Sequence, residues 1–405
     1  MQHKVYIGDN LQVLSSTDFE NQYINTVSVI YIDPPYNTKT KKSYSDSQER
    51  REWLKFMEDR LWLGRNHLKD EGVIFISIDD NEYAYLKVLC DKVFGEQNCL
   101  GTFITKQSQR SNSKHINTVH EYILAYAKNK KKCPEFKVKR IDTPEGRNVI
   151  YDVSSLARKA IENTKITQDN DYWFISRSGN FPNAQKEFRK VLAEYIGTNQ
   201  GLSWLRNYNC IDDSGHVYFA TDLSTPGKPR TVDIPEIGLH LDPLPTRGWS
   251  SDAKFIELHN AGRLIFRDGR PYAIHYLNEA EDSAPSILDF YSRQGNEDMK
   301  RLGLDGIFDT PKPVNMLKYL LRITGVKEGI VMDFFAGSGS FCQATEEVNK
   351  EDKKNIQCVL IQLDENIQDG TEAYNRCKEL GIEPNIPAVL EARLQKAKCD
   401  YEIIW

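Results

Sequence analysis

Over the first third of the chain, short apolar runs alternate with longer amphipathic stretches. Val27–Ile32 (VSVIYI) is a continuous, mostly β-branched run, which is typical of a strand buried on both faces of a sheet. The prolines at 34 and 35 end it, since neither can continue a ladder or a helix. Helices are predicted over residues 48–69 and 81–94, and further strands over Val73–Ile78, Thr102–Thr105 and Tyr122–Ala127. Strands separated by helices indicate βαβ units and a mainly parallel sheet.

The same rhythm returns near the C-terminal end. Here the pattern predicts helices over Val314–Ile323 and Ser340–Asn349, and strands over Ile330–Asp333 and Gln357–Leu363. The middle of the chain instead holds turn pairs such as Pro226-Gly227, many aromatic residues and few long periodic segments. We therefore predict one α/β domain built from residues 1–139 and 301–405, with a mixed α+β domain over residues 140–300 inserted into it.

Composition narrows the class of protein. The 405 residues, 40% hydrophobic and 27% charged, are ordinary for a soluble globular chain of two or three domains. No stretch is apolar enough to span a membrane, and the eight cysteines form no C-x-x-C pair. We expect a reduced, cytoplasmic protein without a metal site. The net charge of −5 argues against a histone-like coat for nucleic acid but leaves local basic patches open.

A glycine-rich turn follows the strand that ends at Asp333. The segment DFFAGSGS places Phe335, Gly337 and Gly339 between that strand and the next helix. Glycines there allow a tight turn and the close approach of a ligand, and the helix N-terminus presents unpaired N–H groups. Taken alone, the turn is weak evidence, since a dinucleotide site or a purely structural tight turn would also explain it.

The second motif is Asp33-Pro34-Pro35-Tyr36, directly after the first buried strand. A carboxylate followed by two prolines sets an acceptor side chain beside a backbone carbonyl, with no proline N–H to compete. That pair suits the two hydrogens of an exocyclic amine, and Tyr36 offers a flat face for stacking a base. The alternative is a proline-rich strand exit with a capping Asp. Two such motifs at strand ends of one sheet favour a ligand site.

Together, D-P-P-Y and F-x-G-x-G resemble the motifs of DNA amino-methyltransferases that use S-adenosylmethionine. Their order along the chain resembles the permuted β group of that family, and other segments resemble the modification (Mod) subunits of type III restriction-modification systems. The resembling segments are YIDPPYNT (31–38), 59–61, GVIFISIDDNE (72–82), HEYILAYAKN (120–129), FDTPKPV (308–314), DFFAGSG (333–339) and CVLIQLDE (358–365). The resemblance implies a Rossmann-like methyltransferase domain with circularly permuted motif order and an inserted target-recognition domain.

The resemblance also implies a role for each matching residue. Phe335, Gly337 and Gly339 would shape the pocket for the methionine part of the cofactor, with Asp333 beside its amino group. Lys312 matches the position that closes this pocket, and Asp9 matches the acidic position near the adenine of the cofactor. The family's acidic residue for the ribose falls here at Gln362, with Asp364 two residues on, so that contact is open between the two.

Asp33, Pro34, Pro35 and Tyr36 would then be catalytic. Hydrogen bonds from a flipped-out base to the Asp33 carboxylate and the Pro34 carbonyl would favour an available lone pair on its amine. Asp before Pro-Pro-Tyr favours N6 of adenine over N4 of cytosine. N4-cytosine methylation remains an alternative, RNA methylation is less favoured, and a non-catalytic DNA-binding specificity subunit is the alternative from another class.

A basic stretch supplies a candidate surface for double-stranded DNA. Residues 106–140 hold ten Lys and Arg against two Glu, and the run Lys130, Lys131 and Lys132 is the expected phosphate contact. A solvated loop is the alternative for that run. Without a P-loop motif in the sequence, ATP-dependent cleavage needs a separate restriction subunit. A homodimer also stays open.

Overall fold

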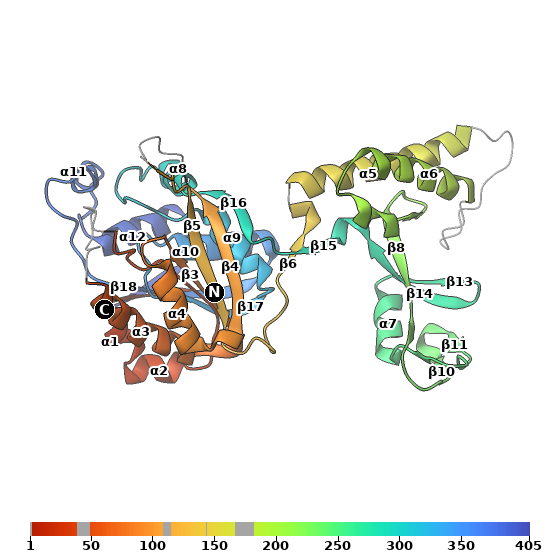
Figure 1. Ribbon diagram of the computed structural model, residues 1–405, viewed down its shortest axis with the longest axis horizontal. Coiled ribbons are helices and arrows are strands. Elements are labelled where there is room, and N and C mark those ends of the chain that lie inside the picture. The colour runs from red at the N-terminus through yellow and green to blue at the C-terminus, as the bar shows by residue number, and fades with distance from the viewer. Residues whose placement is uncertain (1, 39–48, 108–114, 143, 167–181) are drawn as a thin grey trace. The chain divides into compact units, whose positions relative to one another are not determined.

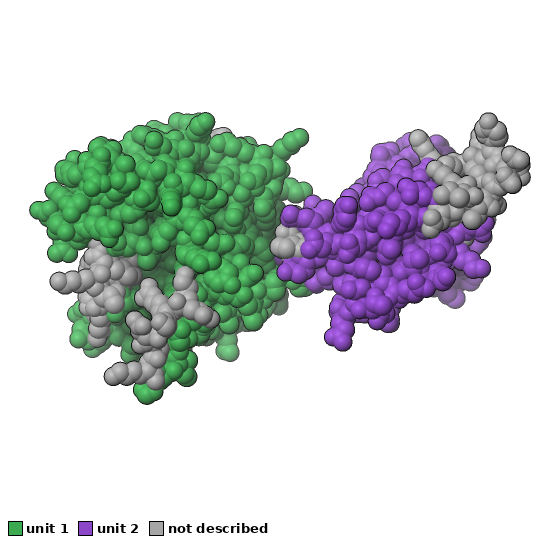
Figure 2. Space-filling model, turned by 90° about the horizontal axis from the view of Figure 1, so that it is seen from above, with its two compact units in different colours: residues 1–137, 283–405 green, residues 138–282 purple. Residues whose placement is uncertain are grey.

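The computed structural model describes residues 2–38, 49–107, 115–142, 144–166 and 182–405. The chain divides into two compact units, residues 1–137 with 283–405 and residues 138–282, coloured separately in Figure 2. No helix among the described residues is long and apolar enough to cross a membrane.

A nine-stranded sheet organises the first unit (Figure 1), in the order β16-β4-β5-β3-β2-β17-β18-β1-β19. Its strands are β1 (His3–Ile7), β2 (Val27–Ile32), β3 (Leu68–Ile78), β4 (Cys99–Lys106), β5 (His120–Ala127), β16 (Ile287–Tyr291), β17 (Glu328–Asp333), β18 (Asn355–Gln362) and β19 (Tyr401–Ile404). All pairs are parallel except those of β5, which runs antiparallel to β3 and to β4. The prediction of an α/β fold with a mainly parallel sheet is confirmed.

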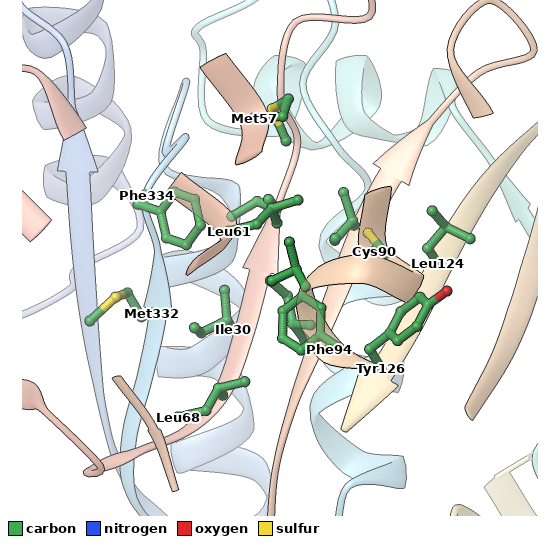
Figure 3. Packing of buried hydrophobic residues seen from close by; sticks show 14 of the residues in the cluster. Ile30, Met57, Leu61, Leu68, Cys90, Phe94, Leu124, Tyr126, Met332 and Phe334 are labelled. Atoms are coloured by element: carbon green, nitrogen blue, oxygen red, sulfur yellow. The ribbon is translucent and has the colours of Figure 1, made fainter. Parts of the chain in front are cut away.

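Helices of this unit pack on both faces of the sheet. They are α1 (Asn10–Leu14), α2 (Thr17–Tyr23), α3 (Arg50–His67), α4 (Tyr83–Phe94), α8 (Arg293–Arg301), α9 (Val314–Ile323), α10 (Ser340–Asp352), α11 (Glu372–Glu379) and α12 (Ile386–Lys396). Side chains alternate along β2, so Ile30 joins the core under α3 and α4, shown in Figure 3, while Tyr31 lies 5.5 Å from the Phe341 ring of α10. Burial on both faces explains the uninterrupted apolar run of β2.

The second unit has its own small cores. Its helices are α5 (Pro144–Ile166), α6 (Pro182–Thr198) and α7 (Asp252–Asn260). Its strands are β7 (Cys210–Ile211), β8 (Val217–Asp222), β9 (Ser224–Thr225), β10 (Val232–Ile234), β11 (Leu239–Leu241), β12 (Gly248–Trp249), β13 (Leu264–Arg267) and β14 (Arg270–Tyr276). One apolar cluster joins α5 and α6, and another forms around Trp249 and Phe255. The connections β6 (Lys137–Lys139) and β15 (Glu281–Ser283) pair with each other.

The second unit ends earlier than the boundary expected at residue 300. Residues 287–291 form β16, which pairs with β4 at the edge of the large sheet, and α8 also belongs to the first unit. The reason is visible in the burial pattern. Within β16 only Leu288 is buried, so this strand lacks the apolar run that marks a central strand.

Candidate active site

The two sequence motifs leave the sheet at the same edge. β2 and β17 are parallel neighbours with Ile30 opposite Met332, so Asp33 and Asp333 both lie where their strands end. Carboxyl ends of strands in an open α/β sheet are where ligands bind. One cavity there is lined by Asp9, Asn10, Tyr31, Asp33, Pro34, Pro35, Phe56, Arg60, Phe308, Thr310, Pro311, Lys312, Asp333, Phe334, Phe335, Ala336, Gly337, Ser338, Ser340, Phe341, Ile361, Gln362, Leu363, Glu365 and Ile386.

The exit from β2 is held rigidly by its neighbours. Trp53 of α3, itself buried, donates from its indole N–H to the Pro35 carbonyl at 2.8 Å. The Tyr36 hydroxyl donates to Asp33 Oδ1 at 2.8 Å, and the Tyr36 side chain is buried. Asn37 has a left-handed φ of 57° and donates from its amide to Glu82 at 3.0 Å. These contacts fix where the Asp33 carboxylate points.

Lys312 reaches the same carboxylate from the segment before α9. Its Nζ lies 3.1 Å from Asp33 Oδ1, 2.8 Å from the Tyr36 hydroxyl and 3.3 Å from Oε2 of Glu121, a residue on β5. Asp33, Tyr36, Lys312 and Glu121 therefore form one polar cluster, which we call the Asp33 cluster. It joins three segments that are far apart in the sequence.

Helix α8 places Lys312. The buried Asp298 of α8 accepts a hydrogen bond from the backbone N–H of Val314 at 2.8 Å and so caps the start of α9. A Cβ built on Gly295 of α8 would lie 1.7 Å from the Pro311 carbonyl oxygen. The backbone on both sides of Lys312 thus rests directly on this helix.

Burial governs the acidity of the two motif aspartates. Desolvation raises the pKa of Asp33, and Glu121 raises it further, while Lys312 and the Tyr36 hydroxyl lower it. Desolvation also holds the pKa of Asp333 well above its usual range, despite the hydrogen bond from the Phe335 N–H at 2.9 Å. Among the residues that the structure describes, Asp333 forms no ion pair.

The two glycines of the turn have different neighbours. Both have left-handed φ values, 52° at Gly337 and 79° at Gly339. A Cβ on Gly337 would lie 3.2 Å from the ring of Phe308 in the cavity wall, whereas a Cβ on Gly339 would lie 3.2 Å from Leu390 of α12. Gly337 therefore shapes the cavity, and Gly339 allows α12 to pack closely.

A buried arginine of α12 supports the serines of the turn. Arg393 donates from Nη1 to the hydroxyls of Ser338 at 2.8 Å and Ser340 at 2.6 Å. Burial lowers the pKa of Arg393 to about 10. The two hydroxyls also lie 3.4 Å apart, so one of them donates to the other and the second keeps a hydrogen to donate elsewhere.

The residues expected at the cofactor fall into two groups. Asp9, Lys312, Asp333, Phe335, Gly337 and Gln362 all line the cavity. Asp9 also caps α1 and lies 3.2 Å from Arg60, and the Gln362 carboxamide oxygen accepts from the Gly337 N–H at 2.7 Å. Gly339 and Asp364 do not line it, and Asp364 is exposed, whereas Glu365 lies on the wall.

Sequence reasoning missed Arg60, Glu121 and Glu365. Arg60 is buried on α3, and its side chain bonds both Asp9 and Asn10. Glu365 stands one residue beyond Asp364 in a loop whose path the pattern does not give. The one available signal for Glu121 was its place in the His120-Glu121 pair at the start of a predicted strand.

The run Lys130, Lys131 and Lys132 lies at the opposite edge of the sheet. Because β5 is antiparallel, Tyr122 pairs with Ile78 at the site edge, and Ala127 pairs with Val73 at the far edge. The strand of eight residues separates the run from the Asp33 cluster by roughly 25 Å. Lys132 is ion-paired with Asp70, and Lys130 Nζ bonds the Cys99 carbonyl at 2.8 Å. The run does not flank the cavity.

The cavity fits the sulfonium cofactor that the motifs imply. The buried Asp333 carboxylate, which has no ion pair within the described part of the chain, suits a cationic centre, and the N-terminus of α10 suits a carboxylate. A side chain at position 337 would narrow the cavity beside Phe308. The aromatic rings of Phe56 and Phe335, 5.9 Å apart, form an apolar wall of the same cavity.

Comparisons with known proteins agree with this geometry. The chain is 28% identical to the EcoP15I Mod subunit of Escherichia coli, over 98% of this chain and 64% of that protein. It is 29% identical to the StyLTI Mod subunit of Salmonella typhimurium, over 94% and 56%. It is 25% identical to the type II methyltransferase M.KpnI of Klebsiella pneumoniae, over 91% and 82%. The chain thus spans less than two thirds of those Mod subunits.

A family model also matches most of the sequence. The N6_N4_Mtase model, described as DNA methylase, matches residues 27–374. That range contains Asp33, the Asp33 cluster around it, Asp333 and the glycine-rich turn. The chain belongs to this family of DNA methylases.

Proposed function

We propose that this protein is a sequence-specific DNA methyltransferase that uses S-adenosylmethionine to methylate N6 of adenine. One observation carries the proposal: a single cavity at the carboxyl edge of the sheet is lined both by Asp33-Pro34-Pro35 and by Asp333 with its glycine-rich turn. A place for an exocyclic amine therefore adjoins a place for a cationic methyl donor. Two of the relatives named above are Mod subunits of type III restriction-modification enzymes and the third is a type II methyltransferase, which agrees with this activity.

The chain's own residues prepare the amine. The Asp33 carboxylate and the Pro34 carbonyl accept its two hydrogens, which directs the nitrogen lone pair away from them and toward the Asp333 side of the cavity. Burial, by raising the pKa of Asp33, makes that carboxylate a better acceptor for the hydrogen. Transfer forms one N–C bond, breaks one S–C bond and releases one proton from the amine nitrogen, which Asp33 is placed to receive. Tyr36 stacks on the flipped base.

S-adenosylmethionine supplies, when bound, a methyl group on a positively charged sulfur. Asp333 holds its cationic amino acid end, and the N–H groups at the start of α10 hold its carboxylate. Phe335 and Gly337 shape the wall beside them. Asp9 lies toward the adenine, and for the ribose the cavity offers Gln362 and Glu365 rather than the exposed Asp364.

Target choice is assigned to residues 138–282. This unit has its own cores and is inserted between the two parts that form the catalytic sheet. We further propose that the chain is the modification component of a restriction-modification system that works with a separate restriction subunit. Lys130, Lys131 and Lys132 are a peripheral contact to DNA phosphates in this proposal.

Methyl transfer tests the proposal directly. Purified protein, tritiated S-adenosylmethionine and plasmid DNA should give labelled DNA whose nucleosides contain N6-methyladenine. Asp33→Ala should abolish transfer while cofactor binding, measured by calorimetry, persists. Labelled N4-methylcytosine would assign the other base, and no transfer by a protein that binds both DNA and cofactor would favour a specificity subunit. Profiling methylated bases in a host genome expressing the protein then reads out the target sequence.

A further inference from the structure

One oxygen of the carboxylate proposed to accept the target amine is already engaged by the protein. Asp33 Oδ1 accepts from the Tyr36 hydroxyl at 2.8 Å and lies 3.1 Å from the Lys312 ammonium. Lys312 also lies over the Tyr36 ring, 4.9 Å from its centroid. For an amine to reach this oxygen, both donors must give way, and each then loses one of its acceptors, which is costly for a largely buried ammonium or hydroxyl.

A second carboxylate, that of Glu121, lies within reach of both donors. Its Oε2 lies 3.3 Å from Lys312 Nζ and accepts from the Tyr36 hydroxyl at 3.4 Å. Its side chain is only 13% exposed. Both contacts are longer than those to Asp33, so in this state the donors favour Asp33 and Glu121 holds them weakly.

We propose that Glu121 is a positioning residue that takes over the Lys312 ammonium and the Tyr36 hydroxyl when the target amine occupies Asp33. The inference rests on the proposed function, since it needs an amine that competes for Asp33. Lys312 keeps a carboxylate partner throughout, because it exchanges the partly buried carboxylate of Asp33 for that of Glu121, whose Oε2 lies 3.3 Å from Lys312 Nζ. Tyr36 is released from Asp33 by the same exchange and becomes available to the base.

The charges around Asp33 make the proposal measurable. Asp33 faces Lys312 from the segment before α9, Glu121 from β5, Tyr31 from β2, Tyr36 from its own loop and Asp333 from the end of β17. Of these groups, Glu121 is the carboxylate that raises the pKa of Asp33, and Lys312 is the cation that lowers it. Removing the charge of Glu121 therefore lowers the pKa of Asp33 and also takes from Lys312 the carboxylate that would replace Asp33.

The test is Glu121→Gln, which keeps the shape of the side chain and removes its charge. We expect an unchanged cofactor affinity by calorimetry, a kcat at least tenfold lower, and an acidic limb of the pH–rate profile displaced to lower pH. Asp289→Asn is the matched control, because Asp289 is an exposed carboxylate at the same sheet edge, paired with Lys106. It should retain wild-type kcat and the wild-type profile.

Two results would overturn the inference. One is wild-type turnover in Glu121→Gln, and the other is a reduced kcat with the acidic limb unmoved, which marks a merely structural role. Should Glu121→Gln fail to fold, Glu121→Asp is the second variant. It keeps the negative charge on a shorter side chain, so we expect an unmoved acidic limb and a kcat several-fold lower. An undiminished kcat in Glu121→Asp would refute the proposed exchange. Failure of the proposed function would show differently, as wild-type protein that methylates no DNA.

Discussion

Gly295 offers a sharp test of how α8 positions the site. In an ordinary helix, Gly→Ala stabilises the protein by at most about 1 kcal/mol. Here the new Cβ would lie 1.7 Å from the Pro311 carbonyl oxygen, so helix and backbone must separate by roughly 1.3 Å to reach even a tight contact. The obstructing atom is backbone and cannot rotate away, and overpacking of this kind costs about 1–3 kcal/mol. The middle of that range less the helix-propensity gain leaves a net destabilisation of about 1 kcal/mol.

The larger effect of Gly295→Ala should be on catalysis. Pro311 immediately precedes Lys312, so the displacement moves the ammonium that contacts Asp33 and Tyr36. A misplacement of about 1 Å at a reacting centre can reduce the rate about 100-fold. Urea unfolding measures the first effect, and single-turnover methyl transfer with saturating DNA and cofactor measures the second.

Gly197→Ala is the control for this experiment. Gly197 lies in the last turn of α6, where a Cβ would meet nothing within 4 Å, so the same substitution should leave stability equal or slightly higher and activity unchanged. If Gly295→Ala were as stable and as active as the control, the contact between α8 and the Lys312 segment would not position the lysine, and the reasoning would be wrong.

Four other outcomes follow from the structure. Asp333→Asn should raise the free energy of unfolding at pH 7 and weaken cofactor binding. A carboxyl whose pKa is raised by folding makes the protein less stable as the pH increases above the unfolded pKa of about 4. Urea unfolding between pH 4 and 8 should therefore show a smaller fall in the free energy of unfolding for the variant than for the wild type. Gly339→Ala should lower the melting temperature through its clash with α12, whereas Gly337→Ala should chiefly weaken cofactor affinity in calorimetry. Changing residues 130–132 to Gln should lower DNA affinity equally for all sequences and leave kcat unchanged. The slope of log affinity against log salt concentration should become shallower by about 0.9 for each lost phosphate contact. Replacing residues 138–282 by those of a related enzyme should transfer the methylated sequence and leave cofactor affinity intact, as methylation profiling and calorimetry would show; an active chimera with the original target would place specificity in the catalytic unit.

The predictable elements are those whose burial produces a clear hydrophobic pattern in their own sequence. The run of β2 is apolar because both faces are covered, and its end at Pro34 placed Asp33 at the edge of a parallel sheet. β1 was not predicted because it is short and its burial alternates. β16 was not predicted because it has a single buried side chain. Their place in the sheet depends on partners far along the chain.

For the site, the identity of the motif residues was predictable, but the direction of the strand that brings Glu121 to them was not. Asp33, Lys312 and Asp333 stand in motifs whose chemistry can be argued from the residues themselves. Glu121 joins them, and Lys130, Lys131 and Lys132 lie far away, for one reason: β5 runs antiparallel to β3. Strand direction depends on pairing over long sequence separation, and the apolar run of β5 predicts a strand without giving its direction.

The paired connections β6 and β15 have a consequence for how this protein can diverge. Arg140 N–H donates to the Ala280 carbonyl at one end of the pair, and Ala284 N–H donates to the Phe136 carbonyl at the other. The 145 residues between them therefore leave and re-enter the catalytic unit at one point. From that anchor the entropy of loop closure grows only with the logarithm of length, about 0.6 kcal/mol for each doubling. Insertions, deletions or whole exchanges in this segment thus change the free energy of the nine-stranded sheet little. Under the proposed function, the residues that choose the target can therefore diverge while the Asp33 cluster stays the same.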